Sequence, residues 1–285
     1  MLAKEFEFHA PEELDAALGV LGNGGGIVKV LAGGMSLVPA MNLGLVRPDT
    51  VLSLNHVRGL DQIEDRGDRI AIGAMVRHDR IAADPEIGSA FPLLATAAQA
   101  IGDVQIRHRG TFGGSLAHAD PAADYLPVMT VLGATLRLRS SDGERIVPAR
   151  EFFVDIMLTD LGRDELLVEV EVPKQPDSAR SAYVRLARVE GSFAIVNAAA
   201  VVDEGKAAIA IGGATGAPVL IEPDVDLSGG LSEEALEEIG DSAYEATDEA
   251  FGDLNSSAEY RRELARVFAR RGVQTALGQH NGGPE

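Results

Sequence analysis

Two short stretches of this 285-residue chain combine paired glycines with hydroxyl side chains: Ala32-Gly33-Gly34-Met35-Ser36 and Thr111-Phe112-Gly113-Gly114-Ser115. Glycine has no Cβ and tolerates positive φ, so successive main-chain N–H groups can converge on an anion while a nearby hydroxyl adds a donor. A diphosphate suits such a cradle. The two stretches could hold one diphosphate from both sides. Two unrelated turns would contain the same residues.

The stretch near Gly22 is not a dinucleotide-binding fingerprint. Gly22-x-Gly24-x-x-Ile27 lacks the third glycine and precedes its strand, whereas that fingerprint follows one.

Composition excludes several kinds of chemistry. Without cysteine, the chain can form no disulfide and cannot hold zinc or an iron–sulfur cluster through its own thiolates. Its six histidines form no metal-ligand cluster, so we expect no metal site. A formal charge of −19 opposes binding to nucleic acid or anionic lipid.

Hydropathy and charge distribution indicate a globular cytoplasmic protein. No apolar run approaches the length of a membrane span, and the N-terminus lacks the apolar core of a secretory signal. Residues 207–260 contain no Lys or Arg while acids recur there, which predicts a solvated acidic face or, alternatively, a docking surface for a basic partner.

The elements around the first stretch form a β-α-β-like unit. We expect a helix from Pro11 to Leu21, a strand from Ile27 to Leu31, a short helical segment after Leu37, and a strand from Thr50 to Asn55.

A second region should position the second stretch, which we expect to be a tight loop at Thr111–Gly114. The remaining elements are strands at 69–73, 134–140 and 165–172 and helices at 87–101 and 121–132.

The polar, proline-bearing segment Lys174–Ser178 is the best linker. Beyond it we expect strands at 181–187, 194–202 and 207–211, a helix at 231–244, and a last helix that opens at Ser256, where Glu259 completes a capping box. The domains are therefore 1–176, with subdomains of about 1–55 and 56–176, and 177–285.

With its flanks, the second stretch becomes specific. The segment 107–124 strongly resembles the FAD-binding subunit of molybdenum hydroxylases. Its sequence is Arg107-His108-Arg109-Gly110-Thr111-Phe112-Gly113-Gly114-Ser115-Leu116-Ala117-His118-Ala119-Asp120-Pro121-Ala122-Ala123-Asp124. That family includes the medium subunit of aerobic carbon monoxide dehydrogenase and the flavin domain of xanthine dehydrogenase. Ala32–Pro39 is similar to the family's other loop, and Glu165–Pro173 looks like the strand that closes its flavin domain.

The resemblance implies an α+β fold: two FAD-binding subdomains of the vanillyl-alcohol-oxidase (PCMH) type, then a C-terminal antiparallel sheet with helices. It implies noncovalent FAD and no catalytic acid or base in this chain. The residues implied to hold the pyrophosphate and nearby ribitol are Ala32, Gly33, Gly34, Met35, Ser36, Thr111, Gly113, Gly114 and Ser115.

Four further residues are carried over from the family. Asp124 would accept a hydrogen bond from a sugar hydroxyl, or be a solvated acid. Leu167 would pack near the flavin or adenine, or be a plain core leucine. Arg185 stands where relatives often carry lysine near the flavin, and Phe193 where some carry tyrosine.

The implied function is electron transfer. Electrons would come from the molybdenum cofactor of a large subunit, through [2Fe-2S] clusters of a small subunit, and leave FAD for quinone, NAD, oxygen or another acceptor. The assembly would be a dimer of heterotrimers. The alternatives are a stand-alone FAD-dependent oxidoreductase, a scaffold that has lost FAD, or a carbon monoxide dehydrogenase medium subunit instead of one serving an organic substrate. Met35 favours an organic substrate, because carbon monoxide dehydrogenases often have histidine there.

Overall fold

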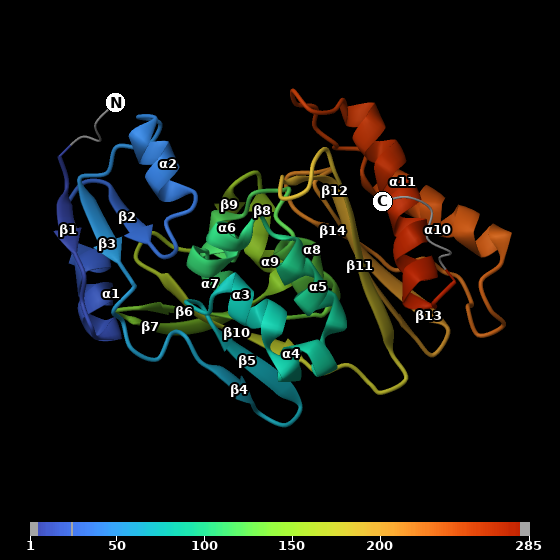
Figure 1. The fold of residues 1–285 in the computed structure, drawn as a ribbon, viewed down its shortest axis with the longest axis horizontal. Coiled ribbons are helices and arrows are strands. Elements are labelled where there is room, and N and C mark those ends of the chain that lie inside the picture. The colour runs from blue at the N-terminus through green and yellow to red at the C-terminus, as the bar shows by residue number, and fades with distance from the viewer. Residues whose placement is uncertain (1–4, 24, 280–285) are drawn as a thin grey trace.

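The computed structural model describes residues 5–23 and 25–279 and contains three packed regions (Figure 1). The N-terminal region is a parallel sheet of β1 (Glu7–His9), β3 (Thr50–Ser53) and β2 (Val28–Leu31), in that order. Helix α1 (Leu14–Asn23) packs on it, and α2 (Leu37–Asn42) follows the first glycine stretch. Helix α1 begins at Leu14 and not at Pro11, because the Glu12 carbonyl accepts from the Arg58 N–H.

The middle region is an antiparallel five-stranded sheet with helices on one face (Figure 1). Its strand order is β4 (Ile63–Asp65), β5 (Arg69–Gly73), β10 (Leu166–Pro173), β6 (Thr135–Ser140) and β7 (Gly143–Pro148). The helices are α3 (His78–Ala83), α4 (Pro85–Ala90), α5 (Pro92–Ala100), α6 (Val104–Arg109), α7 (Phe112–His118), α8 (Tyr125–Val131) and α9 (Ala149–Phe152). A small hairpin, β8 (Phe153–Asp155) with β9 (Leu158–Thr159), lies beside α7.

Two expected helices of this region differ from the structure. The helix expected at 87–101 is divided into α4 and α5, because Pro92 excludes the helical conformation at Phe91, whose φ and ψ are −139° and 69°. The helix expected from Pro121 begins only at Tyr125. Buried side chains of the helices and of one face of the sheet form the largest core, which includes Phe91, Phe112, Tyr125 and Val170.

The C-terminal region is an antiparallel sheet of β11 (Arg180–Ala187), β12 (Ala194–Asp203), β13 (Lys206–Gly212) and β14 (Val219–Ile221). One face packs against α10 (Glu233–Ala246) and α11 (Ala258–Ala276), and the other joins the core of the middle region through residues such as Tyr183. Helix α11 is capped by Ser257 and not by Ser256, because the Ser257 hydroxyl accepts from the Tyr260 N–H.

The acidic segment is partly neutralised within the chain. Asp241 of α10 lies 2.9 Å from Arg266 of α11, and Glu233 lies 4.0 Å from Arg270. The Asp241 and Glu233 side chains are still 60% and 83% exposed, so pairing with arginine does not remove them from solvent. Within residues 5–23 and 25–279, no helix is long and apolar enough to cross a membrane.

Candidate functional site

The second glycine stretch is the start of helix α7 and not the tight loop that the sequence predicts. The Thr111 hydroxyl caps the helix by accepting from the Gly114 N–H at 3.2 Å. Phe112 and Leu116, one turn apart, are both fully buried and hold the helix against the core. Gly113 donates its N–H to the Ala74 carbonyl at 2.8 Å, and a Cβ on Gly113 would lie 2.4 Å from the Ala74 Cβ.

The fold brings the two glycine stretches into contact. A Cβ on Gly33 would lie 2.4 Å from the Arg109 carbonyl oxygen and 2.7 Å from the Gly110 Cα. A Cβ on Gly114 would lie 3.4 Å from the Ala32 Cβ. Gly33 is therefore needed for the two main chains to approach one another, whether or not a ligand is present. The contact of Gly114 with Ala32 is an ordinary van der Waals contact, and its tight neighbour is the Thr111 hydroxyl at 2.5 Å.

Two residues that the sequence analysis did not single out connect the stretches. The Asn55 amide donates to the Ala32 carbonyl at 3.0 Å, and Arg77 donates through Nη2 to the Asn55 amide oxygen at 3.0 Å. The Nη1 of Arg77 donates to the Arg109 carbonyl. No motif marks Asn55 or Arg77, so only the tertiary structure reveals them.

The stretches differ in the donors they leave free. No acceptor among the described residues pairs with the main-chain N–H groups of residues 33–36, and the Ser36 side chain makes no capping bond. In the second stretch, by contrast, the N–H groups of residues 112–115 are all paired within the protein. There the Ser115 hydroxyl has no partner in the described part of the chain, and the Thr111 hydroxyl can still donate its proton. The first stretch thus offers N–H groups, and the second offers hydroxyls.

Two arginines, Arg77 and Arg109, lie close together at this joint, the contact between residues 32–36 and 111–115, although the whole chain carries a charge of −19. Arg109 ends α6, which leads into the second stretch, and Arg77 donates to its carbonyl. The Arg107 guanidinium instead donates to the Ile101 and Gly102 carbonyls, before α6. Burial, and then the positive charge of Arg109, lower the pKa of Arg77. An anion at the joint would relieve this like-charge repulsion.

Asp124 and Arg185 meet across the boundary between the middle and C-terminal regions. The Asp124 carboxylate accepts from the Tyr183 hydroxyl at 2.5 Å and lies 3.1 Å from Arg185. It is 4% exposed, so it is not a solvated acid. Burial raises the pKa of Asp124, while the Arg185 charge and the Tyr183 hydrogen bond oppose that rise. Arg185 also donates to the Ala100 carbonyl at 2.5 Å.

The last two expected site residues lie in different environments. Leu167, on β10, is buried in the core that faces the helices. Phe193 precedes β12 and is 60% exposed. In the same β11–β12 connection, a Cβ on Gly191 would lie 3.3 Å from the Gly102 carbonyl, so this turn contacts the segment that leads into α6.

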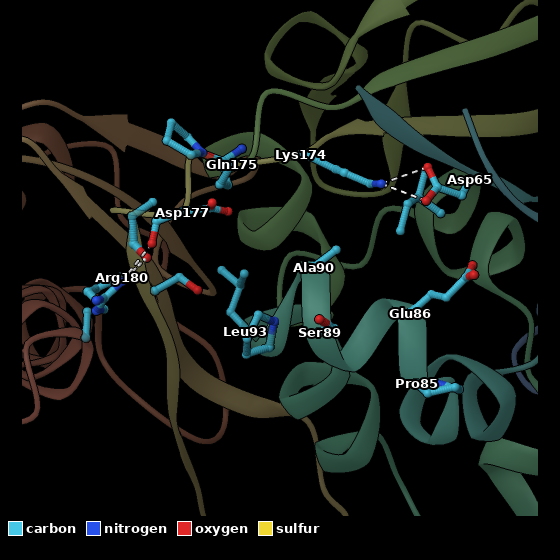
Figure 2. Close-up of a pocket in the computed structure, with 16 residues that line it drawn as sticks. Asp65, Pro85, Glu86, Ser89, Ala90, Leu93, Lys174, Gln175, Asp177 and Arg180 are labelled. Atoms are coloured by element: carbon cyan, nitrogen blue, oxygen red, sulfur yellow. Dashed lines mark hydrogen bonds and ion pairs between the residues drawn. The ribbon is translucent and has the colours of Figure 1, made fainter. Parts of the chain in front are cut away.

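A hollow on the surface of the middle region lies away from this joint. It measures about 730 Å³ and lies between α4 and the segment that follows β10 (Figure 2). The Lys174 ammonium, 2.7 Å from Asp65, spans part of its wall, and Glu86 and Arg180 also line it. A smaller hollow of about 180 Å³ is lined by Leu54, Asn55, Met75 and Arg77 and borders the joint. The donor chemistry and not the hollow volume identifies the candidate site. In the described ranges no three His, Asp or Glu side chains group as metal ligands.

Comparison with known proteins covers nearly the whole chain. Residues 4–175 match the model of the FAD-binding domain in molybdopterin dehydrogenase, and residues 181–276 match the CO dehydrogenase flavoprotein C-terminal domain. The alpha subunit of the 6-hydroxypseudooxynicotine dehydrogenase complex of Paenarthrobacter nicotinovorans is 34% identical over 97% of this chain and 96% of its own length.

Two solved structures share the fold. The carbon monoxide dehydrogenase of Hydrogenophaga pseudoflava, in a form lacking the Mo-pyranopterin moiety, matches with a TM-score of 0.91 and 31% identity over 98% of this chain and 99% of that one. Quinoline 2-oxidoreductase from Pseudomonas putida 86 matches with a TM-score of 0.89 and 32% identity over 98% and 99%.

Proposed function

The chain belongs to the family of FAD-binding medium subunits of molybdenum hydroxylases, and from this premise we propose that it binds the FAD diphosphate at the joint between residues 32–36 and 111–115. The observation that carries the proposal is that the two stretches meet and offer different kinds of hydrogen-bond donor. Where Gly33 meets the Arg109–Gly110 main chain, the first stretch offers N–H groups that no acceptor in the described part of the chain pairs with. The second stretch offers the Thr111 and Ser115 hydroxyls, and Arg77 donates to the Arg109 carbonyl at the same place. A diphosphate needs such donors on both sides.

Each residue of the joint has a separate role. Gly33 and Gly34 present their N–H groups, with Met35 and Ser36 continuing the row, while Ala32 fixes the start of the row through its bond from Asn55. Across the joint, Gly113 and Gly114 allow close packing, and Thr111 and Ser115 supply hydroxyls.

The flavin end would lie towards the boundary with the C-terminal region. There Asp124 would accept a hydrogen bond from a sugar hydroxyl in addition to that from Tyr183, and Arg185 would supply a positive charge. Leu167 would contribute packing from within the core, and the exposed Phe193 would be available to contact the flavin. When bound, noncovalently, FAD supplies the redox chemistry. This chain supplies position and charge, and none of its residues acts as a general acid or base.

We extend the proposal to electron transfer within a complex. The chain would receive electrons from [2Fe-2S] clusters of a small partner subunit, which draws them from the molybdenum cofactor of a large one, and pass them to an external acceptor. A cytoplasmic dimer of heterotrimers is the proposed assembly. Support comes from relatives described as a dehydrogenase complex subunit alpha and a carbon monoxide dehydrogenase medium chain. These names also differ in substrate, which is consistent with a substrate bound outside this subunit.

Flavin binding by serine variants tests the location. Ser36→Ala and Ser115→Ala should each weaken FAD binding by roughly threefold to tenfold, the effect of one lost hydrogen bond. Ser89→Ala, in the large hollow, is the matched control and should bind as the wild type does. Titration followed by flavin fluorescence gives the dissociation constants. A loss of FAD affinity in Ser89→Ala, with none in the other two variants, would show that FAD binds in the hollow of about 730 Å³ instead.

The assembly has its own test. Co-expressed subunits should elute together in size-exclusion chromatography, with a light-scattering mass of two heterotrimers. A flavin-loaded chain that stays monomeric beside both partners would contradict the proposed complex.

A further inference from the structure

Resting on the proposed FAD site, we propose that Arg77 is a positioning residue that acts through Asn55 to set the separation of the two glycine stretches. Neither residue belongs to either stretch. Arg77 precedes α3, and Asn55 follows β3 by a short connection. Together they join the N-terminal region to the middle region at the candidate site.

The main chain around Arg77 holds the second stretch. Arg77 and Thr111 form an isolated antiparallel bridge. On its two sides, the Phe112 N–H donates to the Val76 carbonyl at 2.8 Å and the His78 N–H donates to the Gly110 carbonyl at 3.3 Å. The position of residues 110–112 is therefore fixed relative to the Arg77 backbone.

The side chain of Arg77 holds the first stretch. Its Nη2 donates to the Asn55 amide oxygen at 3.0 Å, and the Asn55 amide nitrogen donates to the Ala32 carbonyl at 3.0 Å. Its Nη1 donates to the Arg109 carbonyl, the oxygen that faces Gly33. One guanidinium thus contacts the Arg109 side of the joint directly and the Ala32 side through Asn55.

The planar fork of arginine is what this arrangement requires. Two nitrogens of one rigid group donate in different directions, to Asn55 and to the Arg109 carbonyl. A lysine ammonium keeps the charge but is a point donor on a flexible stem, so it cannot hold both acceptors in the same geometry. The half-buried guanidinium also lies near Arg109, and this repulsion must be offset by its two hydrogen bonds.

Loss of the fork should separate the donors of the two stretches. The N–H groups of residues 33–36 would then be too far from the Thr111 and Ser115 hydroxyls to contact one diphosphate together. Because the contribution is geometric, restoring the positive charge should not restore affinity. Because Arg77 acts on the first stretch through Asn55, replacing both residues should weaken FAD binding no more than replacing one of them.

A double-mutant cycle on the full chain tests these consequences. The variants are Arg77→Lys, Asn55→Ala and the combination of both, with FAD dissociation constants from fluorescence titration and the melting temperature of each FAD-free protein. Arg77→Lys and Asn55→Ala should each weaken FAD binding roughly tenfold to a hundredfold. The combined variant should have the same FAD affinity as the single variant that binds FAD less tightly. Arg80→Lys is the matched control, because Arg80 borders the same small hollow but donates to the Asp61 carbonyl. It should stay within twofold of the wild type.

Two results would overturn the inference while leaving the FAD site in place. One is wild-type FAD affinity in Arg77→Lys, which would show that Arg77 contributes only its positive charge. Another is multiplication of the two single effects in the combined variant, which would show that the residues act independently. A wild-type chain that binds no FAD would instead refute the proposed function, and this inference with it. Asn55→Ala keeps the test decisive should an Arg77 variant fold poorly.

Discussion

Replacing Gly33 with alanine should separate the two glycine stretches. The added Cβ would lie 2.4 Å from the Arg109 carbonyl oxygen, whereas real Cβ atoms essentially never approach below 3.0 Å. One main chain must therefore move by at least 0.6 Å. That shift also disturbs the hydrogen bond from Arg77 to the same carbonyl.

Overpacking of this kind costs about 1–3 kcal/mol of unfolding free energy. For a chain of this size, such a cost lowers the melting temperature by roughly 2–5 °C. FAD affinity should fall as well, because the donors on the two sides lose their relative position. Circular dichroism melts of the FAD-free protein and fluorescence titration measure the two effects separately.

The matched control is Gly88→Ala. Gly88 lies within α4, and a Cβ there meets nothing within 4 Å. Helix propensity favours alanine over glycine by about 1 kcal/mol, so this variant should melt at or above the wild-type temperature. If Gly33→Ala has the wild-type melting temperature and the wild-type FAD affinity, the contact between the stretches does not constrain the site.

Three further predictions concern the surroundings of the site. Thr111→Ala removes the cap of α7 and should lower the free energy of unfolding by about 0.5–2 kcal/mol in urea. Thr111→Ser keeps the capping hydroxyl and should unfold as the wild type does. Wild-type stability in Thr111→Ala would contradict the role of Thr111 as a cap. Burial lowers the pKa of His78 to about 4, below its ordinary value, so the stability it contributes is present above pH 6.5 and is lost as the pH falls towards 4. Between pH 7.5 and pH 5, wild type should therefore lose about 2 kcal/mol more than His78→Gln does, and equal losses in urea unfolding would refute this. Tyr183→Phe removes a hydrogen bond to the buried Asp124 carboxylate and should cost about 1–3 kcal/mol in guanidinium unfolding; no loss would show that Arg185 alone satisfies that carboxylate.

Much of the fold follows from local pattern. The strand expected at 69–73 is β5 with the same bounds, and the strands expected at 134–140 and 165–172 are β6 and β10, which pair with each other. Burial alternates along most of β6, as in a half-buried strand, whereas β5 and β10 are buried along most of their length. The resemblance adds the α+β class and the FAD-binding family, both confirmed by the matches that cover the chain.

Other features depend on contacts that local pattern does not contain. Paired glycines indicate a turn, so the helix that begins at Phe112 is missed; its formation depends on burial of Phe112 and Leu116 in the core. Ser256 and Ser257 are equivalent caps by residue type, and the structure selects Ser257. Arg77 and Asn55 meet only when two regions of the fold pack together.

The glycines also need a different interpretation from the one their motif suggests. A pair of glycines after a strand is usually explained by the approach of an anion, yet Gly33 and Gly113 are each required by protein atoms, the Arg109 carbonyl and Ala74. Glycine content therefore cannot by itself distinguish an anion site from a close contact between main chains. Donors that no acceptor among residues 5–23 and 25–279 pairs with can make that distinction, and they lie at residues 33–36 and at Ser115. The case for a diphosphate thus depends on the serine variants, whereas the glycine variants test the joint that brings those donors together.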